Sequence, residues 1–295
     1  LSAIILAGCG NRHSDKAGLN KSDITETLSQ TLESEKDSQM NSRSEENTDT
    51  EITDTEAEDS GQVDSEDGSQ EETSNPYIIV REPYTGVPVY EDMEHIYMNT
   101  TWEYADHSAI SDGYAVLYKA AGERKNIIIG VNAGHGTAGG SSVRTLCHPD
   151  GSPKSTGGST AAGATTATAV SGGMTFYDGT PESEVTFRMA QILRDRLLSQ
   201  GYDVRMVSDY ADVQLDNVAR TVICNNVADC HISLHWDGDG LSYDKGCFYI
   251  AVPDAIKDME PVATHWQQHN ALGASLVNWL GDVGMKIHGS GSMAI

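Results

Sequence analysis

The most regular hydrophobic pattern in the chain is a nearly continuous run of β-branched residues from Ile127 to Val131. Such a run is typical of a strand buried on both faces of a parallel sheet, because a strand with one solvated face alternates apolar and polar residues. Shortly afterwards His135 stands between two glycines, in the sequence GHG. We therefore predict a strand over 127–132 whose carboxyl end leads into a tight turn that presents His135.

Three later segments have a helical pattern. Between Pro181 and Gly201, apolar residues recur at spacings of three and four, which predicts a helix. Thr180 fits the cap of this helix and Pro181 its first position. Further helices are predicted over 213–227 and 258–281. The apolar face predicted for the first helix consists of Val185, Met189, Ile192, Leu193 and Leu197.

The remaining strands are predicted over 203–207, 230–235 and 246–252, in the segments that separate these helices. The alternation of strands and helices predicts an α/β fold, a mostly parallel central sheet flanked by helices and joined by right-handed crossovers. Residues 137–180 have no hydrophobic period and are rich in Gly, Ser, Thr and Ala. Because a loop of this length in a compact domain is usually functional, we expect it to belong to an active site.

Charge divides the chain into regions. The net charge is −25, and residues 10–76 hold 19 Asp or Glu against 5 Lys or Arg, with no aromatic residue. Such a segment buries too little apolar surface to offset its ordering entropy, so 10–76 is predicted to be a disordered acidic linker. The catalytic α/β domain is then expected over 77–295, with 77–120 as a short β-rich lead-in. So acidic a protein is not expected to bind nucleic acid.

The first nine residues, LSAIILAGC, form an apolar run that closes in small residues and Cys9. The end of this run is similar to a bacterial lipobox. The resemblance implies cleavage before Cys9, a lipid on its sulfur, and export to the outer face of the cytoplasmic membrane. The alternative is the end of an ordinary signal peptide with an incidental cysteine. The remaining cysteines lack CxxC spacing and are predicted to be free thiols: Cys147, Cys224, Cys230 and Cys247.

Three candidate metal ligands converge at one edge of the predicted sheet. His135 follows the first strand, His235 ends the strand 230–235, and Glu182 begins a helix whose first turn leans toward the same edge. Two imidazoles and a carboxylate are a catalytic zinc set that leaves a fourth position for water. Other histidines fit less well: His231 lies roughly 13 Å along the strand from His235, the 265/269 pair lacks the Glu of H-E-x-x-H, and His148 is expected in a solvated loop.

With these motifs in view, the chain resembles the zinc-dependent N-acetylmuramoyl-L-alanine amidases of bacterial cell-wall turnover, the Amidase_3 type, from about Asn126 to Ile295. The resemblance implies the zinc ligands His135, Glu182 and His235, with Glu184 as a less favoured carboxylate. The motifs that carry it are the strand and GHG over 127–136, Glu182 with its helix, RTVICN over 220–225 against R-x4-N, and SLH over 233–235 against S-[IL]-H.

The implied activity is hydrolysis of the amide between N-acetylmuramic acid and L-alanine in peptidoglycan, with zinc as cofactor. Asn132 and Ala133 stand where the family often has Asp-Pro, and Ser208 where it commonly has Arg. The family's catalytic Glu has no match in the chain and is expected beyond Ile295, in a protein that we expect to be longer at both ends. Two alternatives remain open: a catalytically silent zinc-binding wall or regulatory lipoprotein, and a zinc peptidase acting on stem peptides.

Overall fold

The computed structural model describes residues 2–9, 90–155, 157, 160–209, 214–238 and 244–294. The prediction of an α/β fold with a mostly parallel central sheet and flanking helices is confirmed. The helices are α2 (Glu182–Ser199), α3 (Asn217–Val227) and α4 (Val262–Asp282). The strands are β1 (Ser2–Cys9), β2 (Tyr90–Tyr97), β3 (Tyr114–Ala120), β4 (Ile128–Ala133), β5 (Arg144–Leu146), β6 (Thr166–Thr168), β7 (Asp203–Met206), β8 (Cys230–Asp237), β9 (Cys247–Ala251) and β10 (Ile287–Ala294).

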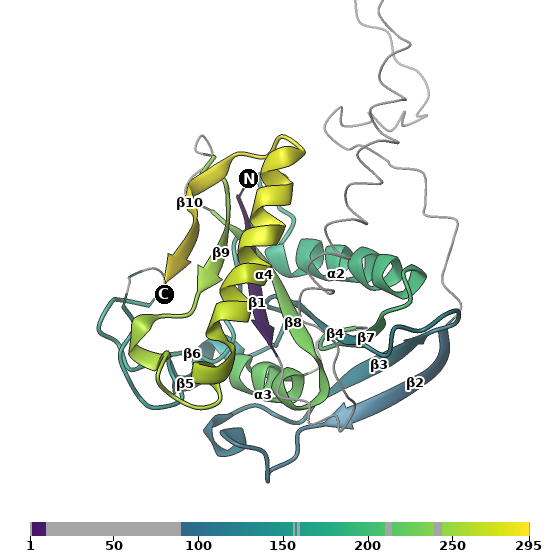
Figure 1. The fold of residues 1–295 in the computed structure, drawn as a ribbon. Coiled ribbons are helices and arrows are strands. Elements are labelled where there is room, and N and C mark those ends of the chain that lie inside the picture. Colours follow the sequence, from purple (N-terminus) through teal and green to yellow (C-terminus); the bar gives the residue numbers. More distant parts are fainter. Residues whose placement is uncertain are drawn as a thin grey trace, which may run out of the picture. The chain divides into compact units, whose positions relative to one another are not determined.

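The main sheet has the strand order β10-β9-β1-β8-β4-β7-β3-β2, and β5 and β6 form a separate pair. Strand β4 is parallel to both of its neighbours, β7 and β8, and all six of its residues are buried. The chain passes from β4 to β7 on one side and returns over β4 to β8 on the other. Right-handed crossovers therefore place α2 and α3 on opposite sides of these strands, as Figure 1 shows. The carboxyl ends of β4 and β8 lie side by side at this switch point, where open α/β sheets bind ligands.

Helix α2 differs from its prediction at its start and on its buried face. It begins at Glu182 with Pro181 as the N-cap, so Thr180 is not the cap. Met189 and Ile192, predicted to be buried, are 37% and 56% exposed. The buried face consists of Glu182, Thr186, Ala190, Leu197 and Leu198. Small side chains at positions 186 and 190 let this helix approach β4 closely, which larger apolar residues at these positions would prevent.

Two further predictions about elements need correction. Helix α3 begins at Asn217 rather than near residue 213, because Asp216 caps it by accepting a hydrogen bond from the Ala219 amide. Strand β10 was not predicted, since its sequence IHGSGSMA has three polar residues and two glycines and lacks a clear strand pattern. The predicted linker over 10–76 and the first part of the lead-in lie outside the described residues.

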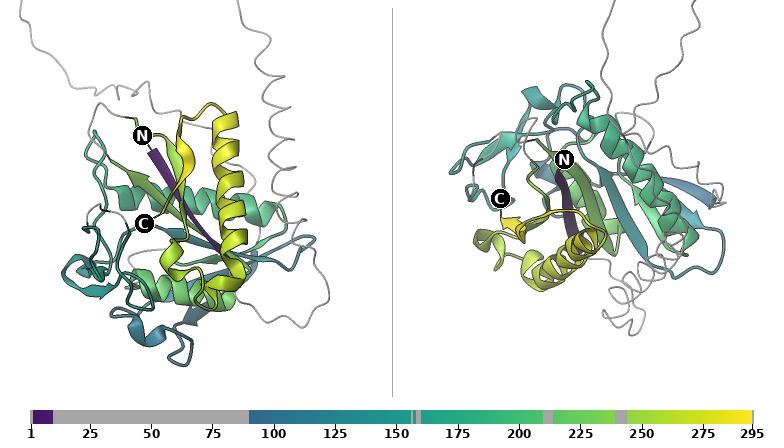
Figure 2. Two further views of the ribbon diagram at one scale, coloured as in Figure 1. Left: turned by 60° about the vertical axis from the view of Figure 1, so that its left-hand side comes forward. Right: turned by 90° about the horizontal axis from the view of Figure 1, so that it is seen from above.

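Strand β1 occupies a position that the sequence does not predict. It lies between β8 and β9, antiparallel to β8 and parallel to β9. Both views in Figure 2 show β1, in purple, running alongside β8. The interpretation of residues 1–9 as the end of an export signal concerns processing of the chain and stays a prediction. Among the described helices, none has the length and apolar character needed to cross a membrane.

Candidate metal centre

The turn after β4 brings His135 back over the edge of the sheet. The Gly134 amide donates to the Leu234 carbonyl at 3.0 Å, which extends the pairing of β4 and β8 by one residue. A Cβ atom on Gly134 would lie 2.3 Å from Cε1 of His235, so only glycine lets the second imidazole pack here. His135 itself has a φ of +68°, in the left-handed region. The GHG sequence therefore places the two imidazoles against each other, with ring centroids 4.6 Å apart and nearly perpendicular planes.

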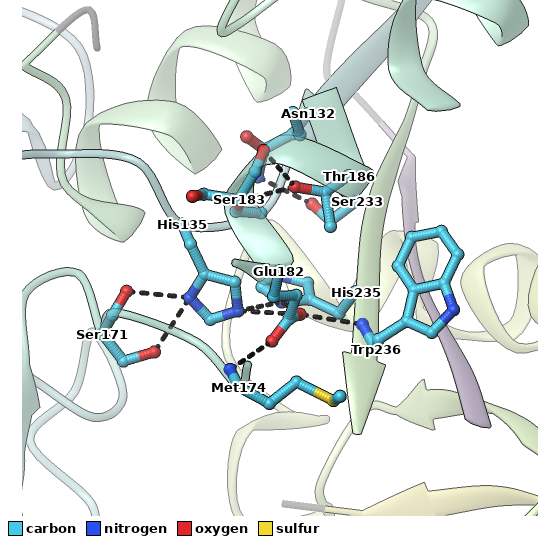
Figure 3. Close-up of polar contacts among 12 residues, drawn as sticks. Asn132, His135, Ser171, Met174, Glu182, Ser183, Thr186, Ser233, His235 and Trp236 are labelled. Carbon is cyan, nitrogen blue, oxygen red and sulfur yellow. Dashed lines mark hydrogen bonds and ion pairs between the residues drawn. The ribbon is translucent and has the colours of Figure 1, made fainter. Parts of the chain in front are cut away.

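Ser171 fixes the tautomer of His135. Nδ1 of His135 lies 2.8 Å from the Ser171 carbonyl oxygen and 3.0 Å from its hydroxyl. Because a carbonyl oxygen only accepts, Nδ1 carries the proton and the lone pair is left on Nε2. Figure 3 shows Nε2 directed at Glu182 and His235. A hydrogen bond from the ring nitrogen that faces away from the metal is the usual support for a histidine that binds metal.

Glu182 lies at the start of α2 and is almost completely buried. Its Oε1 atom is 2.9 Å from Nε2 of His135 and 3.3 Å from Nδ1 of His235. The amides of Met174 and Trp236 donate to Oε2 and Oε1 at 2.9 and 2.8 Å. Burial alone would raise the pKa of Glu182, but the close contacts with the imidazoles of His135 and His235 and the hydrogen bond from the Met174 amide outweigh it, so the pKa lies far below its ordinary value. The carboxylate is therefore ionised.

His235 completes the set from the end of β8. Its Nδ1 lies 3.0 Å from Nε2 of His135. Burial lowers the pKa of His235 despite the opposing hydrogen bond and charge of Glu182, which favours the neutral imidazole that a metal requires. The side chain of His235 is 20% exposed, against 9% for His135 and 2% for Glu182. Access from solvent is therefore greatest on the His235 side.

The spacing of the three atoms fits one metal ion. Two ligands about 2.1 Å from a tetrahedral ion are about 3.4 Å apart, and the observed separations are 3.0, 2.9 and 3.3 Å. Within the described parts of the chain, one group of side chains could hold a metal ion, with ligand atoms within 4.8 Å of one another: His135, Glu182 and His235. The predicted convergence of these residues is present in the structure. Glu184, the alternative carboxylate, is exposed on α2.

A strap formed by residues 171–174 was not identified from the sequence. Ser171 holds His135 and the Met174 amide holds Glu182, while Gly173 lies between them with a φ of +77°. A Cβ atom on Gly173 would lie 2.8 Å from both Oε2 of Glu182 and Cδ2 of His135. The pair Gly172-Gly173 is the only sequence signal for the strap, and it lies in a segment without periodicity.

The remaining histidines lie apart from the centre. His231 is buried on β8, where its Nε2 is 3.1 Å from the Ser233 hydroxyl, and burial lowers its pKa to about 4. His269 contacts the Ile250 carbonyl oxygen through Nε2 at 2.6 Å. The prediction that His148 is solvated is wrong, because it is 8% exposed and bonds to Ser152. The four cysteines other than Cys9 are free, as predicted.

Residues 129–271 match the model of the Amidase_3 family, described as N-acetylmuramoyl-L-alanine amidase. Over this range the chain is similar to the Amidase_3 family. The amidase-like region begins in β4 and ends inside α4, so it contains all three candidate ligands. The match to this family supports a peptidoglycan amidase activity in general. No curated protein and no solved structure was found to match the chain.

Proposed function

We propose that this protein is a zinc-dependent N-acetylmuramoyl-L-alanine amidase that acts on peptidoglycan in cell-wall turnover. The observation that carries the proposal is the convergence of two imidazole nitrogens and one carboxylate oxygen within 3.3 Å of one another, inside the region that matches the amidase family. When bound, zinc would polarise the amide carbonyl and lower the pKa of a coordinated water toward about 7.

The protein's own groups prepare this site. Ser171 keeps the lone pair of His135 on Nε2, and the Met174 and Trp236 amides keep Glu182 ionised and in place. Burial keeps His235 neutral. Because these side chains already face one another, little rearrangement is needed when a cation enters. The more open His235 side is the direction from which a substrate amide would approach.

Metal analysis of the purified chain tests the metal part of the proposal. We expect about one zinc per chain, and we expect His135→Ala, Glu182→Ala and His235→Ala each to weaken binding sharply, because two ligands remain of three. Glu184→Ala is the matched control, since this exposed carboxylate lies two residues from Glu182 on the same helix. Full zinc binding by Glu182→Ala together with loss in Glu184→Ala would contradict the ligand assignment.

Product analysis tests the reaction. An amidase releases peptides that begin with L-alanine and leaves an unsubstituted lactyl carboxyl group on the glycan. A zinc peptidase that cuts stem peptides would instead create a new amino terminus inside the peptide. Zinc binding without either product would support the alternative of a catalytically silent wall-binding or regulatory protein.

The proposed location follows from the sequence alone. We infer that the protein is exported and anchored to the outer face of the cytoplasmic membrane by a lipid on Cys9. Metabolic labelling with a fatty-acid analogue, compared between the natural sequence and Cys9→Ala, tests this. Equal labelling of the two proteins would contradict it.

A further inference from the structure

Arg220 on α3 is the largest fully buried side chain among the described residues, with 1% of its surface exposed. Removing a guanidinium from water is costly unless its N–H groups find acceptors. Arg220 belongs to the RTVICN motif, but the three candidate metal ligands give it no role. Its contacts therefore need an explanation of their own.

Those contacts lie on both sides of His135 in the chain. Nη1 donates to the Ala133 carbonyl at 3.0 Å and to Oδ1 of Asn132 at 3.3 Å, both at the end of β4. Nη2 donates to the Thr137 hydroxyl at 2.8 Å, two residues after His135. The guanidinium thus joins the two ends of the turn that carries the imidazole. We call these hydrogen bonds from Arg220 to Ala133, Asn132 and Thr137 the clamp.

This turn has a backbone that needs support. His135 and Gly136 are both in the left-handed region, with φ values of +68° and +92°. For a residue other than glycine, this conformation persists only where the surroundings hold it. The Leu215 carbonyl reinforces the clamp, because it accepts from Nε of Arg220 at 2.9 Å and from the Thr137 hydroxyl at 2.8 Å.

The clamp itself is anchored on both sides. Asp216 caps α3 through the Ala219 amide and accepts from the Ala109 amide, both at 2.7 Å, so the helix start is fixed against residues before β3. On the other side, Nδ2 of Asn132 donates to the Ser233 hydroxyl at 3.1 Å, which links β4 to β8 two residues before His235 (Figure 3). Arg220 and Asn132 therefore connect α3 with β4, which leads into the turn of His135, and with β8, which carries His235.

We propose that Arg220 is a positioning residue for the metal centre, which holds the turn of His135 so that Nε2 faces Glu182 and His235. The proposal rests on the proposed role of these three residues as metal ligands. In this role Arg220 acts through the Ala133 carbonyl and the side chains of Asn132 and Thr137, which flank His135 in the chain. A purely structural arginine would stabilise the fold without any specific effect on the imidazole of His135.

Zinc affinity of the 295-residue chain, measured by competition with a chromophoric chelator, separates these two roles. Arg220→Met removes the clamp, and Ile223→Ala is the matched control, because Ile223 is fully buried on the same helix and contributes apolar packing. At a temperature where both variants are folded, we expect Arg220→Met to weaken zinc binding about 10- to 100-fold, the usual effect of losing an outer-shell contact. The control should change it less than about twofold.

Two milder variants keep the test decisive if Arg220→Met does not fold. Thr137→Val removes the acceptor of Nη2, and Arg220→Lys retains the charge but not the planar set of donors. Both should weaken zinc binding severalfold. Wild-type affinity in these variants, or an equal loss in Ile223→Ala, would overturn the proposal.

A metal-free readout distinguishes this proposal from the proposed function. In ¹⁵N NMR of imidazole groups, His135 should show a proton on Nδ1 that is hydrogen-bonded to Ser171. We expect this signal to be shifted or lost in Arg220→Met and kept in Ile223→Ala. If the wild-type chain binds no zinc but this difference is observed, the positioning role stands and the metal function fails. If Arg220→Met leaves the signal unchanged, the positioning role fails.

Discussion

Gly173 lies in the strap between Ser171, which bonds to His135, and Met174, which bonds to Glu182. An added methyl group would lie 2.8 Å from atoms of both Glu182 and His135, and the φ of +77° is unfavourable for any other residue. We predict that Gly173→Ala weakens zinc binding at least about tenfold, because the strap must move away from the ligands that it supports. Chelator competition measures this. Gly172→Ala is the control, since a methyl group there meets no atom within 4 Å; equal losses in the two variants would contradict the prediction.

His231 gives the protein a specific sensitivity to acid. Burial lowers its pKa to about 4, below the value of about 6.5 expected in the unfolded chain. Its contribution to stability is therefore complete above pH 6.5 and is lost as the pH falls toward 4, because the unfolded state binds the proton more readily. The free energy of unfolding should fall by about 2 kcal/mol between pH 7.5 and pH 5 through this residue.

Urea unfolding of the natural protein and of His231→Gln at several pH values measures that contribution. Glutamine can still accept a hydrogen bond from Ser233 but does not titrate in this range. The variant should therefore lose about 2 kcal/mol less than the natural protein over the same interval. Parallel pH profiles for the two proteins would show that His231 is not the responsible group.

Residue types and their order were enough to predict that His135, Glu182 and His235 converge, because His135 follows β4, Glu182 begins α2 and His235 lies near the end of β8. The roles of Ser171, Gly173 and Arg220 were not predictable in the same way. Ser171 and Arg220 act partly through carbonyl groups, and Gly173 through the side chain that it lacks. Hydrophobic periodicity carries no signal for contacts of this kind.

At the scale of elements, α2 shows how a functional carboxylate at the start of a helix constrains which of its residues are buried. Ala190 is fully buried, while Ile192 on the same helix is 56% exposed. We predict that Ala190→Leu destabilises the fold by about 1–3 kcal/mol, because the added volume overpacks the close contact between the helix and the sheet. It should also weaken zinc binding, since Glu182 is carried by this helix.

Ile192→Ala is the control for this prediction and should change stability by no more than about 0.5 kcal/mol. Thermal unfolding and zinc titration of both variants provide the comparison. If Ile192→Ala destabilised the protein more than Ala190→Leu, Ile192 would belong to the buried face of α2, as the sequence pattern predicts. The error in that pattern has a physical cause: the helix positions nearest the sheet hold Thr186, which donates to the Gly134 carbonyl at 2.8 Å, and small Ala190.

For the whole molecule, element order was sufficient to predict the α/β fold and the site at the switch point. The central strands β4, β7 and β8 are joined in turn by α2 and α3, and these connecting helices restrict their arrangement. Strands β1 and β10 were missed for different reasons. The run in β1 has the composition of an export signal, and β10 has no regular apolar pattern.

Strand β1 leads to a prediction about the entire sheet. It pairs with β8 over eight residues and also pairs with β9. We predict that a chain beginning at Cys9 exchanges the backbone amide protons of β8 and β9 faster than the 295-residue chain, because seven of the eight residues of β1 are removed. Hydrogen exchange measured by mass spectrometry tests this. Equal exchange in the two chains would show that residues 2–8 do not pair in the folded protein.

Because β1 lies inside the sheet, cleavage before Cys9 would change the pairing of the strands around it. Cleavage there would take a strand out of the interior of the sheet and leave a gap one strand wide, bordered by β8 and β9. Each border would present a row of unpaired amide and carbonyl groups toward the other. A single free edge can attract another chain, but two facing edges can satisfy both sides of an inserted strand. Processing would thus turn a continuously paired sheet into one with an internal gap that can accept an added strand.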